Sequence, residues 1–428
     1  MEPSDRELNR YLAEHVKGVA IDAQMVRSYA SRPASVTSAV SDHGSEGSRV
    51  LFEPRPPIPE LTVLDVPAFG AALEAALEGN VAGYVAQLRQ IGQPILTQEW
   101  QFAKRPQDGS ELWTPDVQLH VASVSKLMTA MAMTRLMGEL NISPDAQIID
   151  YLPDYWVKGP NIEYIVFRNV LDHTSGLSAP DIISFSVIQN AIANGVSLDL
   201  TADHHLGLYC YQNVDYALCR ILLAVMNGNV SRSLDWGSFP NDVVWDFATI
   251  GSYNGYLQAN VFQPSAVVGA TLDHPAATGL AYAEPNDPGP GWNSGNLQEG
   301  CGPYAWHLSV DQVLDVMGEF RRGGGILTPE AALAMLENGF GIDPFVTYKC
   351  ATPGTPTPPW GLATQAGVVY CKNGGWQNNG NIEQALAYFL PQDMELVVLA
   401  NSPTPSFFRD IVTQAYLDNL ITEWLIEP

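Results

Sequence analysis

The chain has 428 residues, 46% of them hydrophobic and 10% aromatic, which is enough for one large domain or two coupled ones. It carries 21 Lys and Arg against 46 Asp and Glu, a formal net charge of −25. This acidity disfavours binding to nucleic acid or to an anionic membrane surface. The sequence has neither a run of about 18 apolar residues that could span a membrane nor an apolar export signal near its start. We expect a cytoplasmic protein, with a removed leader as the open alternative.

The cysteines also argue against a metal centre. Their number is five, which is odd, and they form no C-x-x-C pair, so a zinc site is disfavoured. We expect no metal and no cofactor. A bridge between Cys350 and Cys371 and a set of buried thiols remain equally open. The cysteines are Cys210, Cys219, Cys301, Cys350 and Cys371.

The first part of the chain predicts an arm followed by mixed structure. Residues 1–60 are polar and broken by Pro and Gly, as in an extended or partly ordered arm. A short helix is expected from Pro67 to Leu77. Strands are expected at 83–88 and 95–104, and residues 117–121 then lead into a central helix.

The middle of the chain differs from its two ends. Residues 141–299 contain short helical pieces between Pro and Gly, with few runs that alternate with period two. We interpret this part as a mostly helical insertion. Its clearest expected helices lie at 182–193, 216–226 and 245–261.

The last part returns to mixed structure. Ser309 begins a Ser-x-x-Gln capping box, and Thr328 followed by Pro329 begins a second helix. Together the elements predict an α/β (α+β) fold: an antiparallel sheet flanked by helices, from residues 61–140 and 300–428, with the helical part inserted. The remaining expected elements are strands at 367–371, 384–390 and 395–400 and a helix at 406–425.

The most informative stretch is HVASVSKLMTAMAMTRLMGEL, from His120 to Leu140. A helix that is apolar on all sides is normally buried, and Ser123 and Lys126 stand one turn apart at its start. A desolvated lysine loses its proton more easily and can activate a serine. The helix N-terminus adds N–H groups for developing negative charge. By itself, however, S-x-x-K often marks an ordinary helix start.

Three further fragments are weak individually. Leu171 to Leu177 reads LDHTSGL and equally fits a capped turn. Tyr211 precedes a helix and could relay protons if a nearby cation lowered its pKa, and Asn213 could donate to a substrate carbonyl. Both also fit a core tyrosine and a helix cap. Lys372-Asn373-Gly374-Gly375, at a strand end, could hold a substrate or form a hairpin turn.

In this order and spacing, the four fragments resemble the serine β-lactamase and penicillin-binding-protein superfamily, in its branch of class C β-lactamases, DD-peptidases and esterases. The resemblance covers about residues 60 to 425. It implies a β-lactamase/transpeptidase-like fold with the active site between the sheet and the helical part.

The resemblance also implies roles for particular residues. Ser123 would be the acylated nucleophile, Lys126 its base and Tyr211 the proton shuttle, while Asn213 and the segment Lys372-Asn373-Gly374 would bind substrate. The N–H groups of Ser123 and Gly375 would form the oxyanion hole, and His173 would be structural.

Two departures from the family bear on the substrate. The family's K-T-G is here Lys372-Asn373-Gly374, without the threonine hydroxyl, and Gln212 replaces a small residue inside Y-x-N. We therefore predict a serine hydrolase acting on a small ester through an acyl-enzyme, with amide hydrolysis and acyl transfer also open. The alternatives are a β-lactamase or D-amino-acid peptidase, which Lys372 favours, and a non-catalytic binding protein on the same scaffold.

Overall fold

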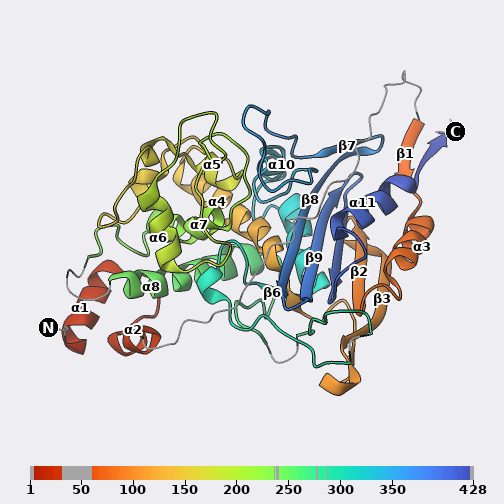
Figure 1. The fold of residues 1–428 in the computed structure, drawn as a ribbon, viewed down its shortest axis with the longest axis horizontal. Helices are drawn as coiled ribbons and strands as arrows, with labels where there is room; N and C mark the ends of the chain where they lie inside the picture. The colour runs from red at the N-terminus through yellow and green to blue at the C-terminus, as the bar shows by residue number, and fades with distance from the viewer. Residues whose placement is uncertain are drawn as a thin grey trace.

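The computed structural model describes residues 4–30, 60–235, 237, 241–275, 278–286 and 288–424. Seven strands form one antiparallel sheet in the order β4-β3-β2-β10-β9-β8-β7. Figure 1 shows this sheet on the right and the helical half on the left, so the predicted fold class is confirmed. The strands are β2 (Gly83–Gln90), β3 (Gln93–Lys104), β4 (Glu111–Leu112), β7 (Leu362–Thr364), β8 (Gly367–Asn378), β9 (Asn381–Leu390) and β10 (Met394–Ala400).

Both faces of the sheet are covered by helices. Alternate residues of a strand point to opposite faces, and β10 shows this clearly: Leu396 and Val398 belong to one apolar cluster, Val397 and Leu399 to the other. Helices α3 (Val66–Leu77) and α11 (Phe408–Asp418) cover the first face. Helix α9 (Val310–Gly318) covers the second, followed in the chain by α10 (Pro329–Glu337).

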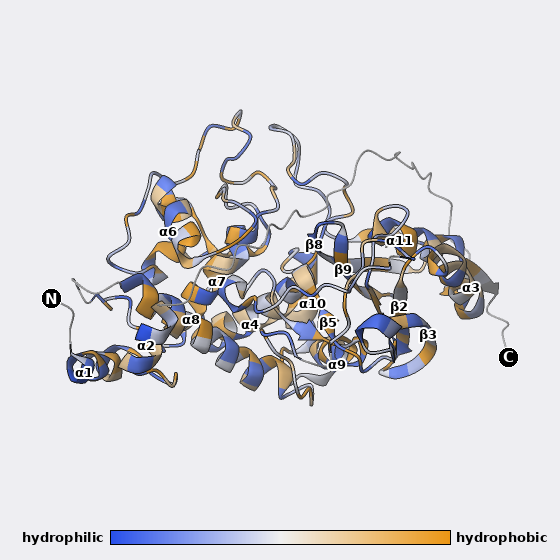
Figure 2. Ribbon diagram, turned by 60° about the horizontal axis from the view of Figure 1, so that its bottom comes forward, coloured by the Kyte–Doolittle hydropathy of each residue, from blue (hydrophilic) through white to orange (hydrophobic). Residues whose placement is uncertain are grey.

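The helical half is built around α4 (Ser125–Leu140), in which 11 of 16 residues are buried. This confirms the predicted core helix. Apolar residues recur along the helices around it (Figure 2). A short antiparallel pair, β5 (Leu119–His120) with β6 (His307–Leu308), ties the start of α4 to the later part of the chain. The other helices are α5 (Phe167–Leu171), α6 (Phe185–Asn194), α7 (Asn213–Met226) and α8 (Asn241–Leu257).

The N-terminal residues differ from the prediction. Instead of an extended arm, residues 5–30 contain α1 (Asp5–His15) and α2 (Ala23–Ala30). Leu8 and Leu12 lie four residues apart on one face of α1 and are buried, so this stretch has an apolar side that the overall polar composition concealed. Residues 31–59 of the predicted arm lie outside the described part of the chain, and the proposed domain boundaries stay predictions.

The C-terminal region corrects two further predictions. The last helix ends at Asp418 rather than continuing to residue 425, and β11 (Leu420–Trp424) pairs with β1 (Glu60–Leu64). Strand β8 is longer than expected, so Lys372 to Gly375 lie inside it and not at its end or in a turn. The hairpin turn falls instead at Asn379-Gly380, where both residues have positive φ.

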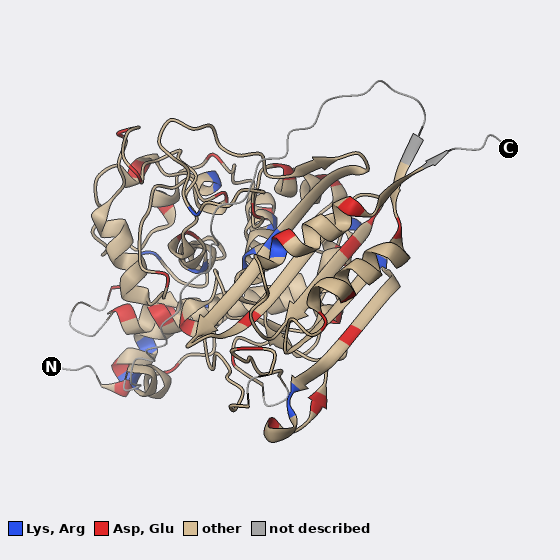
Figure 3. Cartoon of the chain, turned by 45° about the vertical axis from the view of Figure 1, so that its right-hand side comes forward, with Lys and Arg blue, Asp and Glu red and all other residues tan. Residues whose placement is uncertain are grey.

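The predicted caps of α9 and α10 are confirmed. Ser309 and Gln312 form a reciprocal capping box, and the Thr328 side chain accepts from the Ala331 N–H. Across the described residues, each helix is too short or too polar to cross a bilayer. Acidic side chains are distributed over both halves of the molecule (Figure 3).

Candidate active site

Ser123 lies in a 3-10 turn, Ala122–Val124, that leads directly into α4. Its side chain is partly exposed, whereas the Lys126 side chain one turn later is fully buried. The Lys126 Nζ atom lies 3.0 Å from Ser123 Oγ. The structure therefore brings together the nucleophile and base that the sequence predicted, with only the nucleophile reachable from outside.

Lys126 occupies a site that disfavours its charge. Burial, and the nearby cation of Lys372, hold the pKa of Lys126 well below its usual range. Its Nζ also lies 2.8 Å from Asn213 Oδ1 and 3.0 Å from the Pro303 carbonyl oxygen. A neutral amine has two N–H groups and one lone pair. The two carbonyl oxygens satisfy the donors, which leaves the lone pair for the Ser123 hydroxyl proton.

Tyr211 completes the three-residue arrangement. It lies at the end of the α6–α7 loop, and its hydroxyl donates to Ser123 Oγ at 2.7 Å. Lys126 Nζ and Lys372 Nζ each lie 4.7 Å from the centre of its ring. Burial, aided by Asp343, nevertheless raises the pKa of Tyr211 well above its usual range, so the site does not provide a tyrosine whose pKa is lowered by a nearby cation. Tyr211 is thus a neutral hydrogen-bond donor.

Asn213 and His173 support this centre from behind. The Asn213 side chain accepts from Lys126, as expected, while its amide donates to the Asp181 carbonyl at 3.0 Å. His173 Nδ1 lies 2.9 Å from the buried Asp215 carboxylate, and its ring lies 4.5 Å from that of Tyr211. These contacts fix the start of α7 next to Tyr211, which agrees with a structural role for His173.

Strand β8 provides the opposite wall of the site. A Cβ atom on Gly374 would lie 2.4 Å from the Val121 carbonyl oxygen and 3.1 Å from the Ser123 nitrogen. Only glycine therefore lets β8 approach the turn Ala122–Val124, which we call the nucleophile turn, this closely. Gly375, the predicted second oxyanion-hole residue, is less crowded: its nearest neighbour would be Ile382 at 3.9 Å.

Asp343 is the most important residue that sequence reasoning missed. Lys372 Nζ forms a short ion pair with Asp343 Oδ1, and the Asn373 N–H donates to Asp343 Oδ2 at 2.8 Å. Although burial opposes ionisation, the ammonium of Lys372 keeps the pKa of Asp343 below its usual value. Asp343 lies in a loop that matches no motif, so its sequence context carried no signal.

The cysteine pairing also differs from the one considered. Cys210 is bonded to Cys350, while Cys371 is a buried thiol. The disulfide joins the residue before Tyr211 to the loop that carries Asp343. Among the described side chains, the one group close enough to share a metal ion is His204, Cys210 and Cys350, and the disulfide occupies two of its members.

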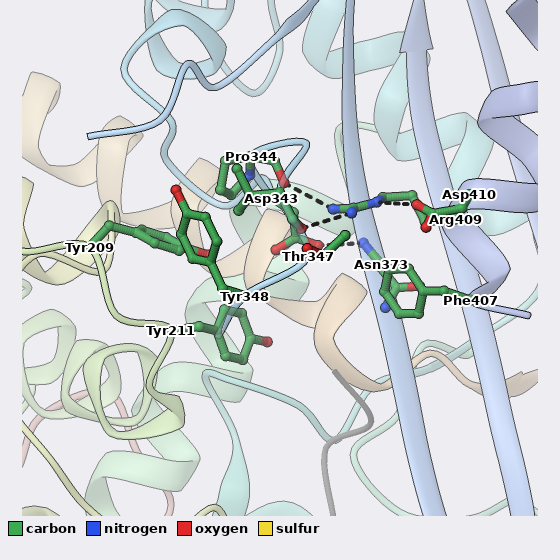
Figure 4. Close-up of a pocket in the computed structure, with 11 residues that line it drawn as sticks. Tyr209, Tyr211, Asp343, Pro344, Thr347, Tyr348, Asn373, Phe407, Arg409 and Asp410 are labelled. Atoms are coloured by element: carbon green, nitrogen blue, oxygen red, sulfur yellow. Dashed lines mark hydrogen bonds and ion pairs between the residues drawn. The ribbon is translucent and has the colours of Figure 1, made fainter. Parts of the chain in front are cut away.

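A pocket opens beside Tyr211 and Asn373 (Figure 4). The Arg409 guanidinium reaches it but donates to the carbonyl oxygens of Pro344 and Val346, each at 2.9 Å. The wall is mixed, with three aromatic rings besides that of Tyr211. The lining residues are Tyr209, Tyr211, Asp343, Pro344, Val346, Thr347, Tyr348, Asn373, Phe407, Arg409 and Asp410.

Comparisons with known proteins agree with this fold. The family model described as Beta-lactamase matches residues 69–229, whereas a search of curated proteins gives no match. Among solved structures, a class C β-lactamase from Rhodobacter sphaeroides aligns with TM-score 0.59 and 18% identity, over 82% of this chain and 98% of its own.

Two other neighbours have different described activities. A β-lactamase/D-alanine carboxypeptidase from Yersinia pestis aligns with TM-score 0.55 and 14% identity, over 82% of this chain and 97% of its own. EstCE1, a hydrolase with promiscuous acyltransferase activity, aligns with TM-score 0.56 and 15% identity, over 82% and 98%. The chain therefore has a β-lactamase-like fold, and its residues 69–229 match the Beta-lactamase family model. The predicted resemblance is confirmed.

Proposed function

We propose that this protein is a serine hydrolase that cleaves small, uncharged esters through an acyl-enzyme on Ser123. One observation carries the proposal: Ser123 Oγ lies within 3.0 Å of a buried lysine amine and within 2.7 Å of a buried tyrosine hydroxyl. A nucleophile, a base and an acid are thus in contact before substrate binds.

In the acylation step, neutral Lys126 takes the Ser123 proton while Oγ attacks the ester carbonyl carbon. The carbonyl oxygen becomes an oxyanion, which the N–H groups of Ser123 and Gly375 would stabilise. When the C–O bond to the alcohol breaks, the leaving alkoxide takes the Tyr211 proton. The proton held by Lys126 then restores the phenol.

In the deacylation step, water attacks the acyl carbon and loses its proton to Lys126. The second tetrahedral intermediate collapses, which breaks the C–O bond to Ser123 and releases the carboxylic acid, and Ser123 Oγ takes back the proton that Lys126 holds. If an alcohol takes the place of water, the same steps transfer the acyl group, and acyltransferase activity is described for one structural neighbour, EstCE1.

The charges around the site favour an ester over a substrate with a free carboxylate. Lys372, the family's expected carboxylate partner, is 1% exposed and already paired with Asp343. Arg409 is held by two backbone carbonyls. A substrate carboxylate would have to displace Asp343 in order to pair with Lys372, and the threonine hydroxyl that would assist it is absent.

The direct test uses p-nitrophenyl esters of increasing chain length with the wild type and Ser123→Ala. The variant is expected to lose at least ~10³-fold in kcat/KM, and equal turnover by both proteins would overturn the proposal. Labelling of Ser123 by a fluorophosphonate tests the non-catalytic alternative independently, because it requires an activated serine and no particular substrate.

A β-lactamase or D-amino-acid peptidase is the second candidate. It is favoured by the position of Lys372, whose amine lies 4.7 Å from the Tyr211 ring and would meet a carboxylate if Asp343 moved. Mass spectrometry after a penicillin pulse tests this candidate. A penicilloyl adduct on Ser123, or penicillin hydrolysis that Ser123→Ala lacks, would support it, and the lack of both would exclude it.

A further inference from the structure

A second pair of buried polar side chains lies directly behind the nucleophile turn and takes no part in the proton transfers above. His120 belongs to β5, three residues before Ser123, and Glu383 belongs to β9. His120 Nδ1 lies 2.9 Å from Glu383 Oε2, and the two side chains are 0% and 1% exposed. Burying two titratable groups is unfavourable unless they satisfy each other, so this pair calls for an explanation.

The nucleophile turn, which lies next to this pair, has an unfavourable backbone conformation. Ala122 has φ +45°, in the left-handed region that residues with a Cβ rarely adopt, and such a conformation costs on the order of 1–3 kcal/mol unless its surroundings impose it. On one side the Val121 N–H donates to the Trp306 carbonyl at 3.0 Å. On the other, the Val121 carbonyl rests against Gly374 of β8.

The His120–Glu383 contact links the same turn to a third element, strand β9. Glu383 lies opposite Trp376 in the β8–β9 ladder, and the next residue, Gln384, lies opposite Gly375. The contact therefore joins the turn that presents the Ser123 N–H to the register position that presents the Gly375 N–H. A displacement at this contact would therefore change the spacing of the two predicted oxyanion donors.

The surroundings favour an uncharged pair. Burial lowers the pKa of His120 to about 3 and raises the pKa of Glu383 to about 7. The groups facing Glu383 from other elements are His307, His274 and Ser294. His120 is therefore neutral, and its Nδ1 shares one hydrogen bond with Glu383 Oε2, whose direction depends on the tautomer of the ring.

We propose that the His120–Glu383 hydrogen bond positions Ser123 and aligns the oxyanion hole by holding the Ala122 turn against β9. The two residues are positioning residues, since neither touches Ser123, and the assignment rests on the proposed hydrolase function. A packing role alone would tolerate any side chain of similar size, whereas this role requires the hydrogen bond itself.

The test compares two variants of equal size. Glu383→Gln keeps a hydrogen-bond partner for His120 Nδ1, and Glu383→Met does not. With a p-nitrophenyl ester, Glu383→Met is expected to lower kcat about 10- to 100-fold with KM changed less than threefold, and Glu383→Gln to stay within threefold of wild type. Equal losses in the two variants, or no loss in Glu383→Met, would overturn the proposal.

A double-mutant cycle provides the second measurement. His120→Phe should cost about as much as Glu383→Met, and combining them should add little, because both remove one bond. Additive losses would contradict it. If Glu383→Met fails to fold by circular dichroism, His120→Asn against His120→Phe makes the same comparison from the other residue.

For the same variants, the rate at which a fluorophosphonate labels Ser123 is also measured. This rate does not depend on the choice of ester substrate. A wild type that labels but hydrolyses no ester would refute the ester assignment. The ranking of the variants by labelling rate would then still decide whether the pair positions Ser123.

Discussion

Lys126 combines full burial with three hydrogen-bond partners, and this combination determines how activity should depend on pH. In the proposed mechanism the base is the neutral amine, so kcat/KM is expected to rise with pH through the lowered pKa of Lys126 and then level off. The raised pKa of Tyr211 means that no loss from its ionisation should follow below about pH 10. A pH profile of ester hydrolysis measures both features.

The neighbouring cation, Lys372, allows the direction of the pH shift to be tested. Because Lys372 helps to lower the pKa of Lys126, Lys372→Met should move the rising limb to higher pH. Asp343→Asn removes a charge that raises the same pKa and should move the limb to lower pH. Shifts in the opposite directions would mean that a different group acts as the base.

Among the elements, strand β8 has the most restrictive contact with the nucleophile turn. Gly374→Ala would place a methyl group 2.4 Å from the Val121 carbonyl oxygen, so the strand or the turn must shift. We expect kcat to fall about 100-fold, since small displacements of catalytic groups have effects of this size. Gly375→Ala serves as the comparison and should lose much less, because its nearest contact would be at 3.9 Å.

The Cys210–Cys350 disulfide links two loops across 140 residues of sequence. Its loss removes a long-range restraint on the unfolded chain and frees the segment that carries Tyr211, so Cys350→Ser should lower the free energy of unfolding by about 2–5 kcal/mol. Thermal unfolding with and without dithiothreitol measures this. The wild type should lose stability on reduction, while Cys350→Ser should not respond further. Cys371→Ala, which removes a free thiol, should remain sensitive to reduction.

The elements also show which features a sequence can reveal. Ser123 and Lys126 are one helical turn apart, and Tyr211 and Asn213 flank one helix start, so each pair was visible in the local sequence, and the family resemblance then indicated their roles. Asp343 and the His120–Glu383 pair depend on contacts between distant segments. Their sequence neighbours carried no signal. The extent of β8 was missed for the same reason, because pairing with β9 overrides the turn preference of Asn373-Gly374.

At the scale of the whole molecule, the 46 acidic residues outnumber the 21 basic ones. The resulting negative electrostatic field acts on approaching substrates. Ion pairs within the site cancel locally, but the net charge of −25 does not. An anionic ester should therefore be captured more slowly than a neutral ester of the same acyl length. Added salt shortens the Debye length from about 30 Å at 0.01 M to about 10 Å at 0.1 M and should weaken this repulsion.

We accordingly expect kcat/KM for a p-nitrophenyl monosuccinate to rise severalfold between these salt concentrations, while the value for p-nitrophenyl butyrate stays nearly constant. The neutral ester controls for any effect of salt on folding or on the chemical step. A flat response for both esters would show that the site is shielded from the surface charge. A fall for the anionic ester would mean that a local cation, Lys372 or Arg409, attracts it more strongly than the whole molecule repels it, and would favour the carboxylate-bearing substrates of the second candidate function.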